Sequence, residues 1–165
     1  MKKNSILFFL FIWIGLPVWA QYKTLKDISY VPVSDTDAYR KERCKLDLYY
    51  PEQQKGFATI VWFHGGGLEG GEKELPPVFQ GRKIAVAGVN YRLSPRATHP
   101  AYIDDAAAAV AWVMKHIGEY GGDPTRVYVA GHSAGGYLTL MVGLDKAYLA
   151  RYGEDADRLA GLFPV

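Results

Sequence analysis

Apolar and polar positions along the chain predict short strands of two kinds. Residues 44–50 alternate apolar and polar side chains before Pro51, which predicts a half-exposed strand at or near a sheet edge. Continuous apolar runs at 58–63, 84–91 and 127–130 predict strands that are covered on both faces. The chain between these runs is long enough to hold connecting helices.

Two helices are predicted in these connections. The first begins near Pro100, ends before Gly118 and is favoured by Asp104 and Asp105 near its positive end. Its apolar face recurs every three or four residues, at Ile103, Ala107, Val110, Met114 and Ile117. The second helix runs over about 134–144. Strands alternating with helices predict one α/β domain with a mostly parallel central sheet and helices on both faces.

The first twenty residues have the three parts of a secretory signal peptide. A basic start is followed by an apolar run over residues 6–17 and by the small-x-small triplet 18–20. The alternative is an uncleaved membrane anchor, but residues 6–20 fall short of the roughly 20 apolar residues that span a bilayer. We therefore expect 1–20 to be removed, 21–165 to form the folded domain, and the product to be secreted or periplasmic.

Composition and charge narrow the function classes. The chain is 49% hydrophobic and 22% charged, as in folded domains rather than disordered ones. Loss of the two lysines in residues 1–20 brings the formal net charge from +2 to zero, so charge gives no reason to expect nucleic acid or an anionic membrane as partner. Cys44 is the single cysteine, which excludes an intrachain disulfide and a thiolate metal site. We expect it to be a small apolar residue in a strand.

The sequence Gly131-His132-Ser133-Ala134-Gly135 fits the pattern G-x-S-x-G. It stands between a predicted strand and a predicted helix, where this pattern carries a nucleophilic serine. So sharp a turn needs tiny residues two before and two after the serine, and Gly131 and Gly135 meet that need. The helix start favours negative charge, and the N–H of Ala134 is the first expected oxyanion donor. The alternative is an ordinary turn in which Ser133 is a helix N-cap.

A glycine-rich loop, His64-Gly65-Gly66-Gly67, follows the predicted strand at 58–63. Consecutive glycines let the backbone approach a ligand and aim several N–H groups at one point. We expect Gly66 and Gly67 to supply oxyanion donors, with Gly65 as a substitute, and His64 to order the loop through hydrogen bonds. The alternative, a phosphate cradle, is disfavoured because no Lys-Ser/Thr pair follows the glycines.

Four ordered motifs resemble landmarks of the hormone-sensitive-lipase-like carboxylesterases, which have the α/β-hydrolase fold. The resemblance covers about residues 40–145 and implies an eight-stranded sheet, hydrolysis of carboxylic esters and no cofactor. Among these enzymes the chain is similar to secreted bacterial esterases that act on acetyl or feruloyl groups of plant polysaccharides, so the expected partner is a small-molecule or polysaccharide-linked ester. The motifs are the glycine loop at 64–67, Asn90-Tyr91-Arg92-Leu93-Ser94-Pro95, Gly121-Gly122-Asp123-Pro124 and the serine turn at 131–136.

The chain departs from the family pattern after the serine. The family order is Ser, then acid, then His, whereas all four histidines of this chain precede Ser133. His132 points elsewhere in so sharp a turn, and His99 and His116 are expected at the surface. Asp145 should be carried away from the site by the second helix. We therefore expect the triad Asp and His to lie beyond residue 165.

The end of the sequence supports the same expectation. The apolar run at 162–165 resembles the entry to another strand, and the chain stops there. We interpret 1–165 as a fragment that is nearly inactive alone. Arg92 and Asp123 are expected to anchor loops, and Asp104 and Asp105 to tie neighbouring loops together.

Two other function classes stay open. One is a non-catalytic ligand-binding protein on the same scaffold, as in gibberellin-receptor-like proteins, which requires the gene to end near Val165. The other is a serine peptidase of the prolyl-oligopeptidase type. Those enzymes usually carry an N-terminal propeller, for which the residues before the first strands leave no room, and the glycine loop also favours an esterase. Fluorophosphonate labelling separates an enzyme from a receptor, and ester against peptide substrates separates the two enzymes.

Overall fold

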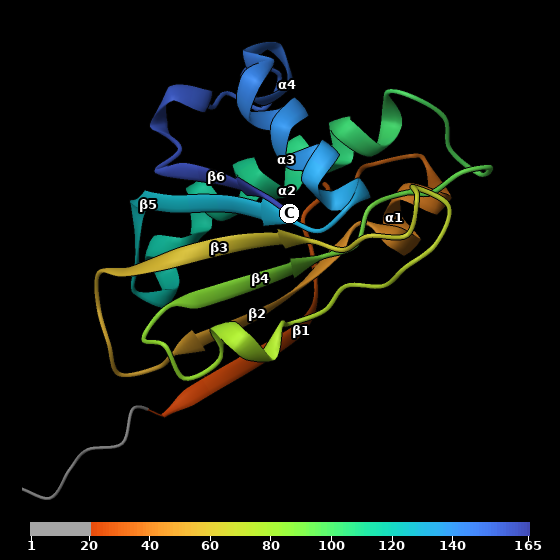
Figure 1. Cartoon of the computed structure of the whole chain (residues 1–165). Helices are drawn as coiled ribbons and strands as arrows, with labels where there is room; N and C mark the ends of the chain where they lie inside the picture. Colours follow the sequence, from red (N-terminus) through yellow and green to blue (C-terminus); the bar gives the residue numbers. More distant parts are fainter. Residues whose placement is uncertain (1–20) are drawn as a thin grey trace, which may run out of the picture.

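The computed structural model describes residues 21–165, so the expected signal peptide at 1–20 lies outside the described residues. Six strands form a sheet in the order β1-β2-β4-β3-β5-β6 (Figure 1). The strands are β1 (Tyr22–Ser29), β2 (Lys45–Pro51), β3 (Phe57–Phe63), β4 (Ala85–Val89), β5 (Gly122–Gly131) and β6 (Gly161–Pro164). The helices are α1 (Ala38–Arg43), α2 (Ala101–His116), α3 (Ala134–Leu144) and α4 (Lys146–Ala150), with 3₁₀ turns at Pro77–Phe79, Ile117–Tyr120 and Ala156–Arg158.

The sheet is mostly parallel, as the sequence predicts. Strands β4, β3, β5 and β6 run parallel to one another, β2 pairs antiparallel with β4, and β1 pairs antiparallel with β2 at the edge. Strand β5 begins earlier than expected, because Gly122 already pairs with Phe57 across an irregularity that ends at Thr59. Asp123, which is expected in a loop, therefore lies within the strand. Asp123 still anchors it as predicted, since its carboxylate accepts bonds from the N–H and hydroxyl of Thr125.

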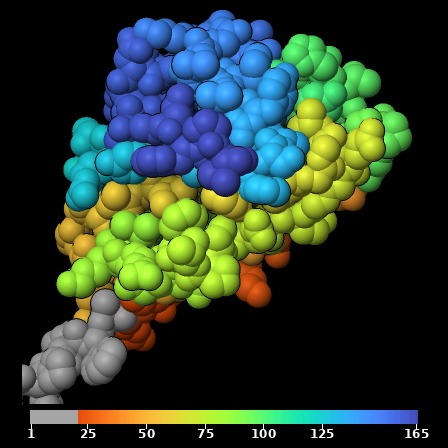
Figure 2. Space-filling view, in the orientation of Figure 1, coloured from red at the N-terminus to blue at the C-terminus, as the bar shows by residue number. Residues whose placement is uncertain are grey.

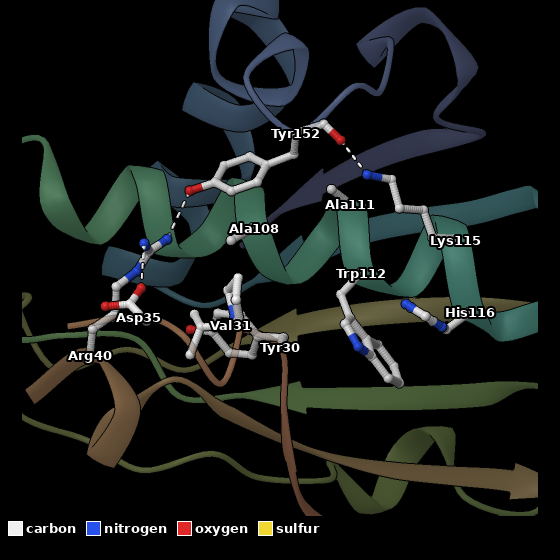
Figure 3. A pocket seen from close by; sticks show the side chains of 11 residues that line it. Tyr30, Val31, Asp35, Arg40, Ala108, Ala111, Trp112, Lys115, His116 and Tyr152 are labelled. Carbon is white, nitrogen blue, oxygen red and sulfur yellow. Dashed lines mark hydrogen bonds and ion pairs between the residues drawn. The ribbon is translucent and has the colours of Figure 1, made fainter. Parts of the chain in front are cut away.

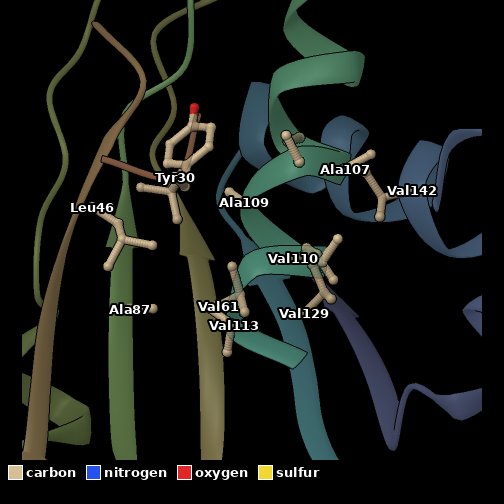
Figure 4. Packing of buried hydrophobic residues seen from close by; sticks show 14 of the residues in the cluster. Tyr30, Leu46, Val61, Ala87, Ala107, Ala109, Val110, Val113, Val129 and Val142 are labelled. Atoms are coloured by element: carbon tan, nitrogen blue, oxygen red, sulfur yellow. The ribbon is translucent and has the colours of Figure 1, made fainter. Parts of the chain in front are cut away.

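Helices α2, α3 and α4 pack on one face of the sheet and build the main core (Figures 1 and 4). All five residues of the predicted apolar face of α2 are buried. Figure 4 shows Val110 and Val113 of α2 directed toward Val61 and Val129 of the sheet. Burial of each such aliphatic side chain contributes about 1.5–3 kcal/mol. The amphipathic pattern of α2 therefore sets which side of the helix packs against the sheet.

The opposite face is covered over part of its area by the chain between β3 and β4. There Trp62, Val86 and Ala130 form a second, small cluster with Leu75 and Phe79. In the space-filling view the segment near residues 75–84 lies over the lower part of this face, and the terminal strand β6 lies at the surface above it (Figure 2). Within residues 21–165, no helix combines the length and the apolar character that crossing a membrane requires.

A buried ion cluster ties the loops beside α2 together, as expected for Arg92 and Asp105. The fully buried Asp105 carboxylate accepts bonds from the guanidinium groups of Arg92, at 2.7 and 2.8 Å, and of Arg40, at 3.0 Å. Asp104 joins the same cluster through Arg40 and the hydroxyl of Tyr152. These contacts hold α1 and the loop after β4 against α2.

Cys44 differs from its predicted place. It lies between α1 and β2 rather than in a strand. The side chain is fully buried, and this burial raises the pKa of the thiol to about 12. A protonated, buried thiol fills space as a small apolar group, which is the role that the sequence indicates.

Candidate active site

Two loops meet at the carboxyl ends of neighbouring parallel strands. Strand β3 runs into the glycine loop and β5 runs into the serine turn, and the last residues of the two strands, Phe63 and Gly131, are paired. The N–H of His132 donates to the carbonyl of Phe63 at 3.2 Å, which fastens the start of the serine turn to the end of β3. Motifs far apart in the sequence are thereby brought side by side.

Ser133 occupies a strained backbone conformation at the start of α3. Its φ is 55° and its ψ is −113°, a region that non-glycine residues rarely adopt. Such a residue costs on the order of 1–3 kcal/mol and persists where its surroundings hold it. The Ser133 side chain is exposed and makes no capping bond to the helix. The structure therefore gives no support to the alternative in which Ser133 is an ordinary N-cap.

The glycines on either side of the serine are needed for steric reasons. A Cβ atom on Gly135 would lie 2.1 Å from the carbonyl oxygen of Phe63, and one on Gly131 would lie 2.5 Å from the Gly135 carbonyl. These neighbours are backbone atoms, which cannot move aside as a flexible side chain does. The turn can close against β3 because both positions lack a side chain.

The glycine loop lies against the serine turn. A Cβ atom on Gly65 would lie 3.0 Å from Nδ1 of His132 and 3.4 Å from the Cβ of Ser133. Gly66 and Gly67 have φ values of 112° and 65°, which favour glycine. Within residues 21–165, the N–H groups of Gly66, Gly67 and Ala134 donate to no other group. Free amides in a loop that lies against the turn of an exposed serine are what an oxyanion hole requires, and the assignment of these three to that role stays a prediction.

His64 orders the glycine loop through a hydrogen bond to its backbone. Its Nδ1 lies 2.7 Å from the carbonyl oxygen of Gly65, and because a carbonyl only accepts, Nδ1 carries the hydrogen. The trans peptide then directs the N–H of Gly66 away from the imidazole. The His64 ring is buried and stacks on Tyr91 with centroids 4.5 Å apart. Burial lowers the pKa of His64, so the ring is neutral near pH 7 and serves to orient the loop.

The other histidines show no hydrogen-bonded arrangement for general-base chemistry within residues 21–165. Among the described residues, no histidine nitrogen is hydrogen-bonded to the hydroxyl of Ser133. His116 stacks on Trp112 and contacts Glu119 at 2.8 Å, and His99 is exposed, as predicted for both. Asp145 caps α4 through the N–H of Ala147, at the far end of α3 from the serine.

One contact of the serine turn is missing from the sequence-based prediction. The N–H of Ser133 donates to the carbonyl of Val165 at 2.7 Å, and the N–H of Val165 donates to the carbonyl of Gly131 at 2.9 Å. Val165, at the end of β6, is therefore hydrogen-bonded to two residues of the serine turn. The bond also occupies the Ser133 amide, which leaves the Ala134 amide as the first free donor in the serine turn.

A cavity of about 260 Å³ lies elsewhere, between α2 and the chain after β1 (Figure 3). It contains neither the serine nor any glycine of the two loops. Its cations are already paired, since Arg40 contacts Asp35 and the hydroxyl of Tyr152, and Lys115 donates to the Tyr152 carbonyl. The cavity is therefore separate from the candidate active site.

Comparisons with known proteins match this chain to esterases. The family model BD-FAE matches residues 46–155. Carboxylesterase NlhH of Mycobacterium tuberculosis is 41% identical over 106 residues, covering 61% of this chain and 32% of that protein. Among solved structures, a bacterial heroin esterase has a TM-score of 0.62 at 30% identity, covering 82% of this chain and 41% of its own.

A further structural relative has the same fold. Esterase B from Lactobacillus rhamnosis has a TM-score of 0.67 at 25% identity, covering 86% of this chain and 45% of its own. The relatives confirm the resemblance to hormone-sensitive-lipase-like carboxylesterases and the α/β-hydrolase fold. The chain spans about a third of the length of the curated relative and less than half of each solved structure.

Proposed function

Because the chain belongs to the BD-FAE family, whose match covers residues 46–155, we propose that it is the nucleophile-bearing part of a secreted serine esterase. The observation that carries the proposal is the exposed, strained Ser133 held against a loop of free glycine amides. A strained serine beside free backbone N–H groups is the arrangement that acyl transfer needs.

The proposed reaction has two steps. The Oγ of Ser133 attacks the ester carbonyl carbon while its proton passes to a histidine, and the negative carbonyl oxygen is held by the N–H groups of Gly66, Gly67 and Ala134. The C–O bond to the alcohol then breaks, and the histidine returns the proton to the leaving alcohol. Water attacks the acyl-enzyme by the same route and releases the carboxylic acid and free Ser133.

The histidine and the acid in this proposal come from outside residues 1–165. No histidine follows Ser133 in the sequence, and curated relatives such as NlhH are about three times longer than the matched region. Without the base, residues 1–165 alone should retain a rate of roughly 10³-fold above water, from the oxyanion donors and binding. We propose a small-molecule or polysaccharide-linked ester as substrate, no cofactor, and export directed by residues 1–20.

The test uses the full-length protein that contains this chain. A fluorophosphonate probe should label wild-type protein and the control Ser34→Ala, which changes an exposed serine of the chain after β1, and should not label Ser133→Ala. Peptide mapping should place the adduct on Ser133. Labelling that persists in Ser133→Ala would show that another residue is the nucleophile. Absence of labelling in the wild type would favour a ligand-binding protein.

Substrate panels test the remaining parts of the proposal. Hydrolysis of p-nitrophenyl acetate, methyl ferulate and acetylated xylan, with no cleavage of prolyl peptides, is the expected result. Efficient peptide cleavage would support the peptidase instead. A burst of p-nitrophenol from isolated residues 21–165 that is absent in Ser133→Ala would overturn the proposal that a base from outside the chain is needed. The N-terminal sequence of protein recovered from the medium or periplasm should begin at Gln21.

A further inference from the structure

Arg43, the last residue of α1, reaches the back of the glycine loop. Its Nε donates to the carbonyl oxygen of Tyr91 at 3.1 Å, one terminal nitrogen pairs with the Glu72 carboxylate, and the other donates to the carbonyl of Gly71. The Arg43 side chain is 12% exposed. One guanidinium therefore connects three points that lie 28 to 48 residues away in the sequence.

Asn90 completes the connection from the end of β4. Its side-chain amide donates to Glu72 at 2.7 Å, and its side-chain oxygen accepts the N–H of Lys73 at 2.5 Å. Burial raises the pKa of Glu72, but hydrogen bonds from Asn90 and Arg43 outweigh it and hold the pKa below its ordinary value. The carboxylate is therefore charged at neutral pH. We call Arg43, Glu72 and Asn90 the loop clamp.

Gly71, which the loop clamp holds, packs against the residues that orient the proposed oxyanion donors. A Cβ atom on Gly71 would lie 2.3 Å from Nδ1 of His64 and 2.5 Å from the carbonyl oxygen of Gly65. This is the same carbonyl that His64 holds, and its peptide carries the N–H of Gly66. Tyr91, whose carbonyl binds Arg43, also donates its hydroxyl to the carbonyl of His64 at 2.8 Å. The clamp therefore fixes both sides of the peptide that presents the donor.

We propose that Arg43 is a positioning residue for the oxyanion loop. The inference rests on the proposed esterase function. Arg43 touches no reacting atom, and it acts by holding Gly71 and Tyr91 against His64. Because oxyanion donors act on charge that exists in the transition state, displacement of the loop lowers kcat and leaves KM nearly unchanged. Lysine at this position cannot reproduce the fork, because one ammonium group cannot reach three separated acceptors in plane.

The kinetic test compares Arg43→Ala and Arg43→Lys with the matched control Arg96→Ala in the full-length protein. Arg96 is also paired with a glutamate, Glu42, but its side chain is 58% exposed and is hydrogen-bonded to no residue of the glycine loop. We expect kcat for p-nitrophenyl acetate to fall roughly 10- to 100-fold in Arg43→Ala, less than the 10²- to 10³-fold loss on deleting a donor. KM should stay within about threefold. Arg43→Lys should recover part of the loss, and Arg96→Ala should stay within about twofold of wild type.

Hydrogen exchange distinguishes a local loss of order in the loop from a general loss of stability. The amides of Gly70, which bonds the carbonyl of Gly66, and of Lys73 should exchange at least about tenfold faster in Arg43→Ala. Amides of α2 should be unchanged. Unchanged kcat and loop exchange would overturn the inference while leaving the esterase intact, and so would equal acceleration in α2. If the wild type hydrolyses no ester, the proposed function fails, and loop exchange alone decides whether Arg43 orders the loop.

Discussion

Replacing Gly135 by alanine places a methyl group where the end of β3 now lies. The new Cβ would be 2.1 Å from the carbonyl oxygen of Phe63, 2.7 Å from its carbonyl carbon and 2.9 Å from the carbonyl oxygen of His64. All three are backbone atoms, so α3 must retreat from the sheet by about 1.3 Å or more to restore contact distances of at least about 3.4 Å. Overpacking of this kind costs about 1–3 kcal/mol, and a rigid backbone neighbour favours the upper part of that range.

A loss of about 3 kcal/mol is measurable by urea unfolding. At an m-value of about 2 kcal/mol/M the midpoint should fall by about 1.5 M. Gly118→Ala is the matched control, because a Cβ there meets nothing within 4 Å and needs no positive φ. It should be neutral or stabilise by a few tenths of a kcal/mol through the unfolded chain. Gly135→Ala should also slow fluorophosphonate labelling, since the retreat moves Ser133 from the glycine loop. Equal midpoints for the two variants would refute the close packing of α3 on β3.

Two further predictions concern buried polar groups. Burial lowers the pKa of His64 below its ordinary value of 6.5, so the unfolded chain binds a proton at this residue more readily than the folded chain does. The unfolding free energy should therefore fall as pH drops below 6.5, and this contribution to the slope should vanish in His64→Gln but persist in the exposed control His99→Gln. Identical slopes in the two variants would count against a buried, neutral His64. Asp105→Asn leaves two guanidinium groups short of a buried carboxylate and should cost roughly 3–5 kcal/mol in urea unfolding, whereas Glu42→Gln, at an exposed pair, should cost less than about 1 kcal/mol. A cost for Asp105→Asn as small as for Glu42→Gln would mean that the buried cluster contributes little.

The sequence predicts well those elements whose own side chains decide their structure. The apolar run that becomes β3 is covered on both faces, and the spacing along α2 gives the buried face that the structure has. The two flanking elements are different. Strand β1 has no fully buried residue and is held by pairing with β2, and α1 has six residues of which none is fully buried. Their local patterns are weak because tertiary contacts stabilise them.

The candidate site also combines features that the local sequence predicts with features that only tertiary contacts determine. The serine turn and the glycine loop could be predicted because steric demands on single residues leave a mark in the sequence. Gly88 is required just as strictly, but no sequence pattern reveals it. A Cβ there would lie 2.1 Å from the carbonyl oxygen of Glu74, where the chain between β3 and β4 crosses β4. The loop clamp is hidden for the same reason, since Arg43 is one arginine among several and its partners are known when the fold is known.

The bond from Ser133 to Val165 shows why geometry at the nucleophile exceeds what the motif encodes. Glycines at 131 and 135 permit the sharp turn, but they do not decide which amide points at the substrate. The carbonyl of Val165, at 2.7 Å, takes the Ser133 N–H, and the Val165 amide takes the carbonyl of Gly131. With those two groups engaged, the next amide along the chain, that of Ala134, has no hydrogen-bond acceptor within residues 21–165. The local sequence thus selects the turn, and the end of the neighbouring strand decides that the Ser133 amide is hydrogen-bonded while the Ala134 amide stays free, as the proposed oxyanion role requires.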